Sequence, residues 1–274
     1  MTAAENTVSP PSGATPAPGW EFDAVVFDMD GVITRTAEVH SRAWKEMFDE
    51  YLRRQAARAG LPFREFTHAG DYLPYVDGRP RYQGVEQFLL SRGLVLPRGS
   101  TTDAPDAETI CGLGNRKNEL FNALIARDGA GLYASTMVLV HDLLAQGRKV
   151  GLATSSRNSA LILDRAGVAR HFAAIVDGLV SEQLGLKGKP APDIFLAASA
   201  RLGVRPARAI VVEDAVSGVE AGAKGGFALV IGVAREHNHD ALRRAGADVV
   251  VGDLAETNLE KINEAVRAKR GRAS

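Results

Sequence analysis

From residue 133 onward, short apolar runs alternate with stretches in which apolar residues recur at helical spacing. The apolar runs predict strands at 149–155, 173–176, 209–212, 228–233 and 248–251, and a further strand lies far upstream at 24–28. The amphipathic stretches predict helices at 136–146, 158–166, 191–202 and 239–245. This alternation is typical of a parallel sheet with helices on both faces, so we expect a doubly wound, Rossmann-like α/β core.

The segment 38–128 lacks strand signals and has helical patterning at 38–59, 84–91 and 107–126. A polar, Gly- and Pro-rich stretch at 71–82 interrupts it. We therefore predict an inserted helical cap domain at 37–128 and a core made of 21–36 and 129–268. Residues 1–20 are expected to form a disordered tail, and 269–274 a short, solvated basic tail.

Composition narrows the range of partners for this chain of 274 residues. The formal net charge is zero, which argues against nucleic acid or an anionic membrane as the main partner. The single cysteine, Cys111, excludes an intrachain disulfide and fits a reducing compartment. No apolar run is long enough to cross a bilayer, and Met1 to Gly19 lacks the features of a secretory signal. We expect a cytoplasmic monomer that acts on a small molecule.

Polar side chains follow the predicted strands at the points where those strands end. Asp28 and Asp30 follow the apolar run 24–27, and Gly31 marks the turn that leaves it. Ligands bind at the carboxyl edge of open α/β sheets, so these groups are expected to meet there. One aspartate could attack an electrophile while the other handles a proton, and both could hold a hard cation such as Mg²⁺. The other strand-end or helix-start signals are Thr154-Ser155-Ser156, Lys189 and Glu213-Asp214.

Each signal also has a purely structural interpretation. Asp-x-Asp-Gly is often a turn, and Thr-Ser-Ser or Glu-Asp can cap the helix that follows. Lys189 alone would be a surface lysine. Their joint occurrence in this order favours phosphoryl transfer, in which hydroxyl and backbone N–H groups hold phosphate oxygens and a lysine neutralises charge.

As a set, these motifs resemble those of the haloacid dehalogenase-like phosphotransferases, and within them the β-phosphoglucomutase subgroup. The resemblance covers residues 22 to about 233 and rests on 27–34, 153–158, 189–195 and 212–214. It implies that Asp28 is the nucleophile and Asp30 the general acid/base, with Thr154 and Lys189 binding the transferring phosphoryl group. The implied cofactor is Mg²⁺. Its implied ligands are Asp28, the backbone carbonyl of Asp30, Glu213 and Asp214.

The same resemblance assigns roles outside the strand ends. Thr36 would lie at the hinge, and His40 would position Asp30. Trp44 and Lys117 would face the sugar, although Trp44 could equally be a helix core residue and His40 a surface residue. The other phosphate of the substrate would meet residues of the core and of the cap. These are Ser156, Asn158, Arg116 and Lys117. Ser155 and Asn118 lie in the same matching stretches and would also bind substrate or phosphate.

The chain also departs from the family pattern. The cap is longer around 64–81, and the stretch 82–87 lacks the Lys and Arg that the family carries around a Gly-Val pair. Arg79 or Arg81 could supply this charge. The implied reaction interconverts β-D-glucose 1-phosphate and glucose 6-phosphate through a phospho-aspartate. A sugar-phosphate phosphatase on the same scaffold is the first alternative, and a catalytically inactive binding module the second.

Overall fold

The computed structural model describes residues 19–273, which build a parallel sheet with the strand order β3-β2-β1-β4-β5-β6. Every neighbouring pair of strands is parallel, and β1 lies in the middle between β2 and β4. This is the doubly wound, Rossmann-like arrangement expected from the sequence. The strands are β1 Ala24–Phe27, β2 Lys149–Ala153, β3 Ala174–Val176, β4 Ala209–Glu213, β5 Leu229–Val233 and β6 Val249–Val251.

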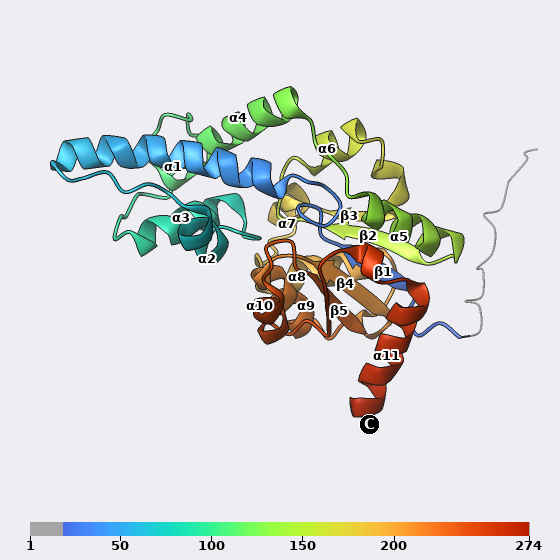
Figure 1. Ribbon diagram of the computed structural model, residues 1–274. Helices are drawn as coiled ribbons and strands as arrows, with labels where there is room; N and C mark the ends of the chain where they lie inside the picture. The colour runs from blue at the N-terminus through green and yellow to red at the C-terminus, as the bar shows by residue number, and fades with distance from the viewer. Residues whose placement is uncertain (1–18, 274) are drawn as a thin grey trace, which may run out of the picture.

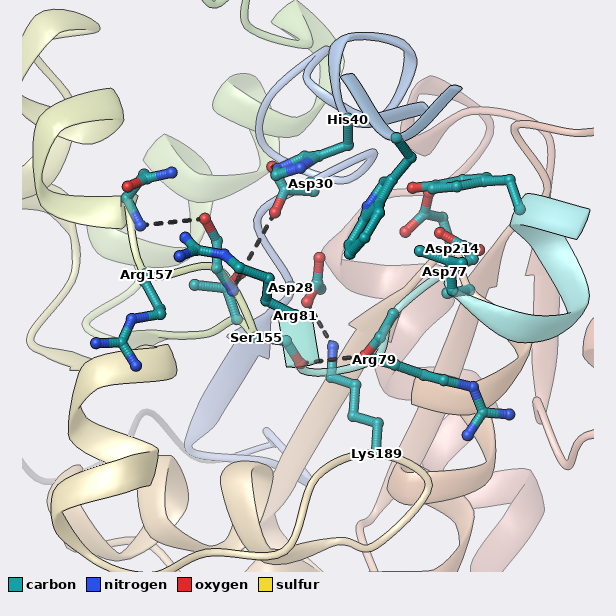
Figure 2. Close-up of a pocket in the computed structure, with 18 of the residues that line it drawn as sticks. Asp28, Asp30, His40, Asp77, Arg79, Arg81, Ser155, Arg157, Lys189 and Asp214 are labelled. Atoms are coloured by element: carbon teal, nitrogen blue, oxygen red, sulfur yellow. Dashed lines mark hydrogen bonds and ion pairs between the residues drawn. The ribbon is translucent and has the colours of Figure 1, made fainter. Parts of the chain in front are cut away.

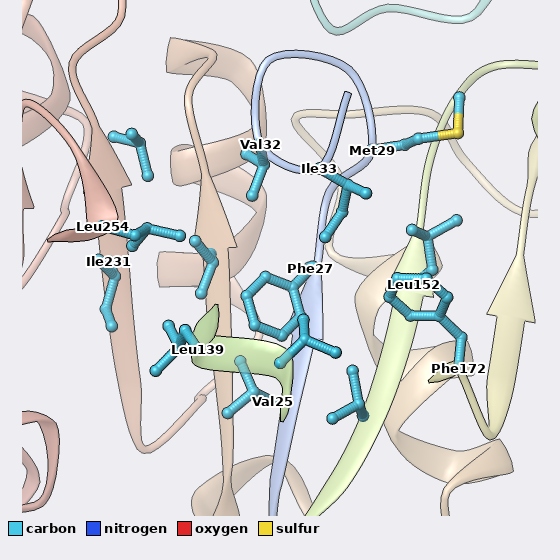
Figure 3. Packing of buried hydrophobic residues seen from close by; sticks show 14 of the residues in the cluster. Val25, Phe27, Met29, Val32, Ile33, Leu139, Leu152, Phe172, Ile231 and Leu254 are labelled. Atoms are coloured by element: carbon cyan, nitrogen blue, oxygen red, sulfur yellow. The ribbon is translucent and has the colours of Figure 1, made fainter. Parts of the chain in front are cut away.

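Helices cover both faces of the sheet (Figure 1). Val25 and Phe27 point into one apolar cluster, while Ala24 and Val26, which alternate with them, point into another. Figure 3 shows Phe27 packed with residues such as Leu139 in the first cluster. Helices α5 (Ala134–Ala145), α6 (Ser159–Arg165) and α11 (Leu259–Ala273) supply this first cluster. Helices α8 (Asp193–Arg201), α9 (Val216–Lys224) and α10 (His239–Arg244) pack against the opposite face.

The segment between β1 and α5 is helical and has an apolar core of its own. Phe48 lies at its centre, with ring centroids 5.0 Å from Phe66 and 4.1 Å from Phe88. This segment, which we call the cap, extends away from the sheet in Figure 1. Its elements are α1 Ala37–Ala59, a π-helix at His68–Tyr72, α2 Leu73–Tyr75, α3 Arg81–Ser91 and α4 Ile110–Asp128.

The chain ends differ from the sequence prediction. The expected basic tail at 269–274 is wrong for its described part, because α11 continues to Ala273. Lys269 donates to Asp248 at 2.6 Å and Arg270 to the carbonyl of Glu21 at 3.0 Å, so both are anchored by acceptors on the core. The expected tail at 1–20 lies outside the described residues except for 19–20, and there Trp20 packs against the first cluster. None of the helices within 19–273 combines the length and apolar character that a bilayer span needs.

Candidate active site

The carboxyl ends of β1, β2 and β4 lie side by side, and they bring the predicted residues together in one pocket (Figure 2). Asp28 and Asp30 follow β1, Thr154 follows β2, and Glu213 is the last residue of β4. Parallel strands end at a common edge, so register alone places these groups together. The pocket is closed on one side by cap residues. From the predicted set it is lined by Asp28, Asp30, His40, Trp44, Lys117, Thr154, Ser155, Ser156, Asn158, Lys189, Glu213 and Asp214.

Gly31 allows the chain to turn sharply beneath the pocket. Its φ is +87°, a left-handed conformation that favours glycine. A Cβ at this position would lie 1.8 Å from Oδ2 of Asp214, so no larger residue fits without moving that carboxylate. The Asp-x-Asp-Gly motif therefore couples the turn after β1 to the acidic end of β4.

Lys189 is the cation at the centre of the site. Its side chain is 1% exposed, and its Nζ donates to Oδ1 of Asp28 and to Oε1 of Glu213, both at 2.5 Å. Burial alone would lower the pKa of Lys189, but the two carboxylates raise it above its usual value. Lys189 therefore stays charged and offers positive charge beside Asp28.

The carboxylates outnumber this cation. Burial raises the pKa of Asp28 well above its usual range, although Lys189 acts in the opposite direction. Burial and the neighbouring Glu213 likewise raise the pKa of Asp214. The carboxylate of Asp214 receives no hydrogen bond from the described residues, whereas Glu213 also accepts from the Ala215 N–H at 2.6 Å. The site thus has unused oxygen acceptors and an excess of negative charge.

These donors fit a Mg²⁺ ion. Within 19–273, no three acidic, His or Cys side chains already surround one point, because Lys189 lies between Asp28 and Glu213. Magnesium does not require such a cage, since it usually binds one or two carboxylates and completes its shell with waters and phosphate oxygens. Asp28 and Asp214 can supply those carboxylates, and Glu213 keeps lone pairs beyond those used by Lys189 and Ala215.

Asp30 is held by hydroxyl groups and faces an imidazole. Thr36, the residue before α1, donates its hydroxyl to Asp30 instead of capping that helix. Thr154 lies within hydrogen-bond distance at 3.4 Å. Lys117 Nζ lies 2.5 Å from Nδ1 of His40, so a proton on the neutral ring belongs on Nε2, which faces Oδ1 of Asp30 at 3.3 Å. Burial and Lys117 lower the pKa of His40, which favours this neutral form.

Lys117 and Trp44 come from the cap and form the roof of the pocket. Lys117 is 4% exposed, and its Nζ lies 5.1 Å from the ring centroid of Trp44 and 4.7 Å from that of Phe121. Burial lowers the pKa of Lys117 well below its usual value, and Arg81 lowers it further. Trp44 also packs on Phe48 in the cap core, which confirms its interpretation as a helix core residue, while its contact with a sugar stays a prediction.

A second polar group lies on the side of the pocket where Figure 2 places Arg81 and Arg157. Asn118 on α4 accepts from Arg81 at 2.7 Å and from the side-chain amide of Asn158 at 2.8 Å. This network joins cap to core. The hydroxyl oxygen of Ser156 accepts a hydrogen bond from the backbone N–H of Asn158 at 3.2 Å. Arg81 and Asn158 thus present hydrogen-bond donors away from Asp28.

The structure corrects the sequence assignment of Arg116 and adds detail to two others. Arg116 does not line the pocket, because on α4 its side chain diverges from that of Lys117 and reaches Glu50 at 3.3 Å. Ser155 lines the pocket, and its hydroxyl donates to the carbonyl of Gly78 at 3.1 Å, so a contact of this hydroxyl with phosphate stays a prediction. The Gly-Val pair at 84–85 is buried within α3, and both Arg79 and Arg81, the two candidates for the missing charge, line the pocket.

Sequence reasoning missed Tyr72, Asp77 and Gly78, which also line the pocket. They lie in the stretch 71–82, which was interpreted as an interruption of the cap. Burial, followed by the charge of Glu213, raises the pKa of Asp77 to about 7. The available signal was an Asp-Gly pair next to two arginines, which marks a turn carrying charge.

A buried carboxylate at the end of a central strand, paired with a lysine and beside free oxygen acceptors, defines a phosphoryl-transfer scaffold. A family model of haloacid dehalogenase-like hydrolases matches residues 22–226. A beta-phosphoglucomutase of Mycobacterium bovis is 46% identical over 236 residues, which are 85% of this chain and 90% of that protein. A beta-phosphoglucomutase of Bacillus subtilis is 35% identical, over 88% of this chain and 94% of that protein.

A solved structure agrees with the sequence matches. The beta-phosphoglucomutase of Clostridium difficile superposes with a TM-score of 0.68 at 25% identity, covering 90% of this chain and 98% of that one. The chain therefore belongs to the haloacid dehalogenase-like hydrolase family. The resemblance inferred from the sequence is confirmed.

Proposed function

We propose that this protein is a Mg²⁺-dependent β-phosphoglucomutase, which interconverts β-D-glucose 1-phosphate and glucose 6-phosphate. The observation that carries the proposal is the presence of two anion-binding ends in one pocket. Lys189 and Asp28 lie at one end, and Arg81 and Asn158 lie towards the other. A mutase needs both ends, because its intermediate carries two phosphates. The sequence relatives named beta-phosphoglucomutase support the same assignment.

The reaction follows from the roles of two aspartates. Phosphorylated Asp28 donates its phosphoryl group to a hydroxyl of the sugar monophosphate, and Asp30 takes the proton of that hydroxyl. The resulting bisphosphate then reverses its orientation in the pocket, so that its other phosphate faces Asp28. Its other phosphate then returns to Asp28, while Asp30 gives the proton back to the leaving oxygen. The sugar leaves as the isomer, and the phospho-aspartate is restored.

The surrounding residues hold and shield the reacting groups. Lys189 and Thr154 hold the transferring phosphoryl group, with Thr36 and His40 positioning Asp30. Lys117 and Trp44 face the sugar from the cap, which excludes water from the acyl phosphate. Mg²⁺ bound by Asp28, the Asp30 carbonyl, Glu213 and Asp214 would neutralise charge on the phosphoryl oxygens. The phosphate that is not being transferred lies at the distal end of the pocket, away from Asp28. It is bound there by Arg81, Asn118, Ser156 and Asn158.

The remaining assignments concern the compartment, the oligomeric state and the partner of the enzyme. We propose a cytoplasmic monomer with a small sugar phosphate as its partner. A net charge of zero supports a small-molecule substrate over nucleic acid. Cys111 is buried, which suits a reducing compartment without requiring one.

Hydrolysis is the competing activity on this scaffold, since water can also attack phospho-Asp28. Product analysis separates the two. The protein is primed with a glucose bisphosphate, given β-glucose 1-phosphate and Mg²⁺, and followed for glucose 6-phosphate and free phosphate. We expect isomerised product with little phosphate. Phosphate release equal to substrate consumption, without glucose 6-phosphate, would establish the phosphatase instead. No turnover of either kind would favour a binding module.

A further inference from the structure

We propose that Asp77 is a substrate-specificity residue, whose carboxylate accepts a hydrogen bond from one hydroxyl of the sugar close to the transferring phosphate. This inference rests on the proposed mutase function and deepens it. It concerns the loop at 76–80 between α2 and α3, which we call the cap loop. Asp77 is the only carboxylate that the cap contributes to the pocket lining, within the residues that the structure describes.

The cap loop is fixed to the core through two consecutive carbonyl groups. Ser217, at the start of α9, donates its hydroxyl to the carbonyl of Asp77 at 3.1 Å. Ser155, after β2, donates to the carbonyl of Gly78 at 3.1 Å. Gly78 has a φ of +68°, and a Cβ there would lie 2.4 Å from the Ser217 hydroxyl oxygen. The loop therefore approaches the core closely, and its backbone sets where Asp77 lies.

The Asp77 carboxylate has acceptor capacity that the protein does not fill. The hydroxyl of Tyr72 acts on this carboxylate and lowers its pKa, and Tyr72 is itself 5% exposed. Lys189, whose charge also acts on Asp77, is already bound to Asp28 and Glu213 at 2.5 Å. A carboxylate offers about four lone-pair positions, so most of those on Asp77 are available to a ligand.

The position of Asp77 selects the kind of group that it can meet. In Figure 2 it lies beside Asp214, whereas Arg81 and Arg157 lie on the opposite side of Asp28 and Lys189. A phosphate at the distal end is therefore held away from Asp77, and the sugar ring must lie between the two. A carboxylate repels phosphate but accepts hydrogen bonds from hydroxyl groups, which are the only donors that a sugar phosphate presents. The partner of Asp77 is consequently a ring hydroxyl near the reacting end.

The test is a cycle of protein and substrate changes. Wild type, Asp77→Ala and Asp77→Asn are compared with β-glucose 1-phosphate and with analogues that each lack one ring hydroxyl, using kcat/KM for isomerisation. Asp106→Asn is the matched control, because Asp106 is an exposed cap carboxylate outside the pocket. Phosphorylation of Asp28 by acetyl phosphate, which has no sugar hydroxyl, is measured in parallel together with its Mg²⁺ dependence.

We expect one missing hydroxyl to cost wild type and Asp106→Asn about 10- to 100-fold in kcat/KM, which is the range for a hydrogen bond to a charged group. Removal of the same hydroxyl should leave the kcat/KM of Asp77→Ala almost unchanged. The loss for Asp77→Asn should lie between that of Asp77→Ala and that of wild type. Phosphorylation by acetyl phosphate should not fall in either variant.

The inference is overturned if every hydroxyl deletion costs Asp77→Ala as much as it costs wild type. It is also overturned if phosphorylation by acetyl phosphate, or its Mg²⁺ affinity, falls in parallel with isomerisation, because Asp77 would then serve the metal or the nucleophile. Failure of wild type to isomerise glucose 1-phosphate would refute the proposed function itself, and this inference with it.

Discussion

At the scale of single residues, the end of the pocket around Asp28 has more carboxyl groups than cations. Lys189 is shared between Asp28 and Glu213, while Asp214 and Asp77 add further carboxyl groups. Buried charges are tolerated only where they are paired or neutralised, so this imbalance marks a place where a cation and a phosphoryl group are handled. Substitutions of Asp28 and of Lys189 should therefore differ in their effect on the free energy of unfolding.

Asp28→Asn should abolish formation of the phosphoenzyme, because an amide is a poor nucleophile towards phosphorus. It should not lower the free energy of unfolding, since it removes one of the carboxylates that are in excess. Urea denaturation and mass measurement after incubation with acetyl phosphate test both parts. A phosphorylated variant would remove Asp28 from the role of nucleophile.

Lys189→Ala should destabilise the fold by about 3–5 kcal/mol, the cost typical of leaving a buried partner charge uncompensated. The carboxylates of Asp28 and Glu213 would then lie within a buried site without their common cation. The same denaturation experiment, run beside Asp28→Asn, measures the difference. Equal stability of the two variants would show that Lys189 does not balance this cluster.

Asp214→Asn should raise the Mg²⁺ concentration needed for half-maximal activity. Asp214 has no hydrogen-bond donor among the described residues, so its oxygens are available for a hard cation, and an amide is a weaker ligand than a carboxylate. A magnesium titration of activity measures the shift. An unchanged titration curve would exclude Asp214 from the metal site.

At the scale of elements, the pocket depends on loops that join the cap to the ends of the strands. The double variant Ser155→Ala with Ser217→Ala removes both hydroxyls that hold the cap loop, each bond being worth about 1 kcal/mol. We expect faster amide hydrogen exchange at 76–80 and a higher KM for the sugar phosphate. Ser91→Ala is the control, because its hydroxyl bonds to Phe88 within α3 and not to the core. Equal effects of the control would exclude a role for the Ser155 and Ser217 hydroxyls in holding the cap loop.

Most elements could be predicted, because buried parallel strands are apolar throughout and amphipathic helices repeat at their own spacing. The helices α7 (Gly178–Gln183) and α11 (Leu259–Ala273) were missed, the first because it has six residues and the second because its basic end resembles a solvated tail. The strand-end groups Asp28 and Glu213 were found through the same register argument, and Lys189 through its place before a predicted helix. Asp77 was not, since its place depends on how a cap loop folds over the core.

At the scale of the whole molecule, the cap has an apolar core around Phe48, and its helices α1 and α4 also contribute residues such as Val39 and Phe121 to the first cluster of the sheet. The pocket forms where these two parts meet. The cap supplies Lys117, Asp77 and Arg81, and the sheet supplies the nucleophile and its cation. Arg116 illustrates a limit of sequence reasoning, because neighbours on one helix face in directions about 100° apart and only Lys117 reaches the pocket. Which residue of a cap helix faces the pocket can be read only when the cap and the sheet are placed together.

The central claim is that phospho-Asp28 returns its phosphoryl group to a sugar rather than to water. The most direct measurement prepares the phosphoenzyme, removes excess donor, and adds glucose 6-phosphate in isotopically labelled water for a single turnover. The proposed mutase should place the phosphoryl group on the sugar as a bisphosphate, with little labelled inorganic phosphate. Release of labelled phosphate at the same rate with and without the sugar would contradict the account.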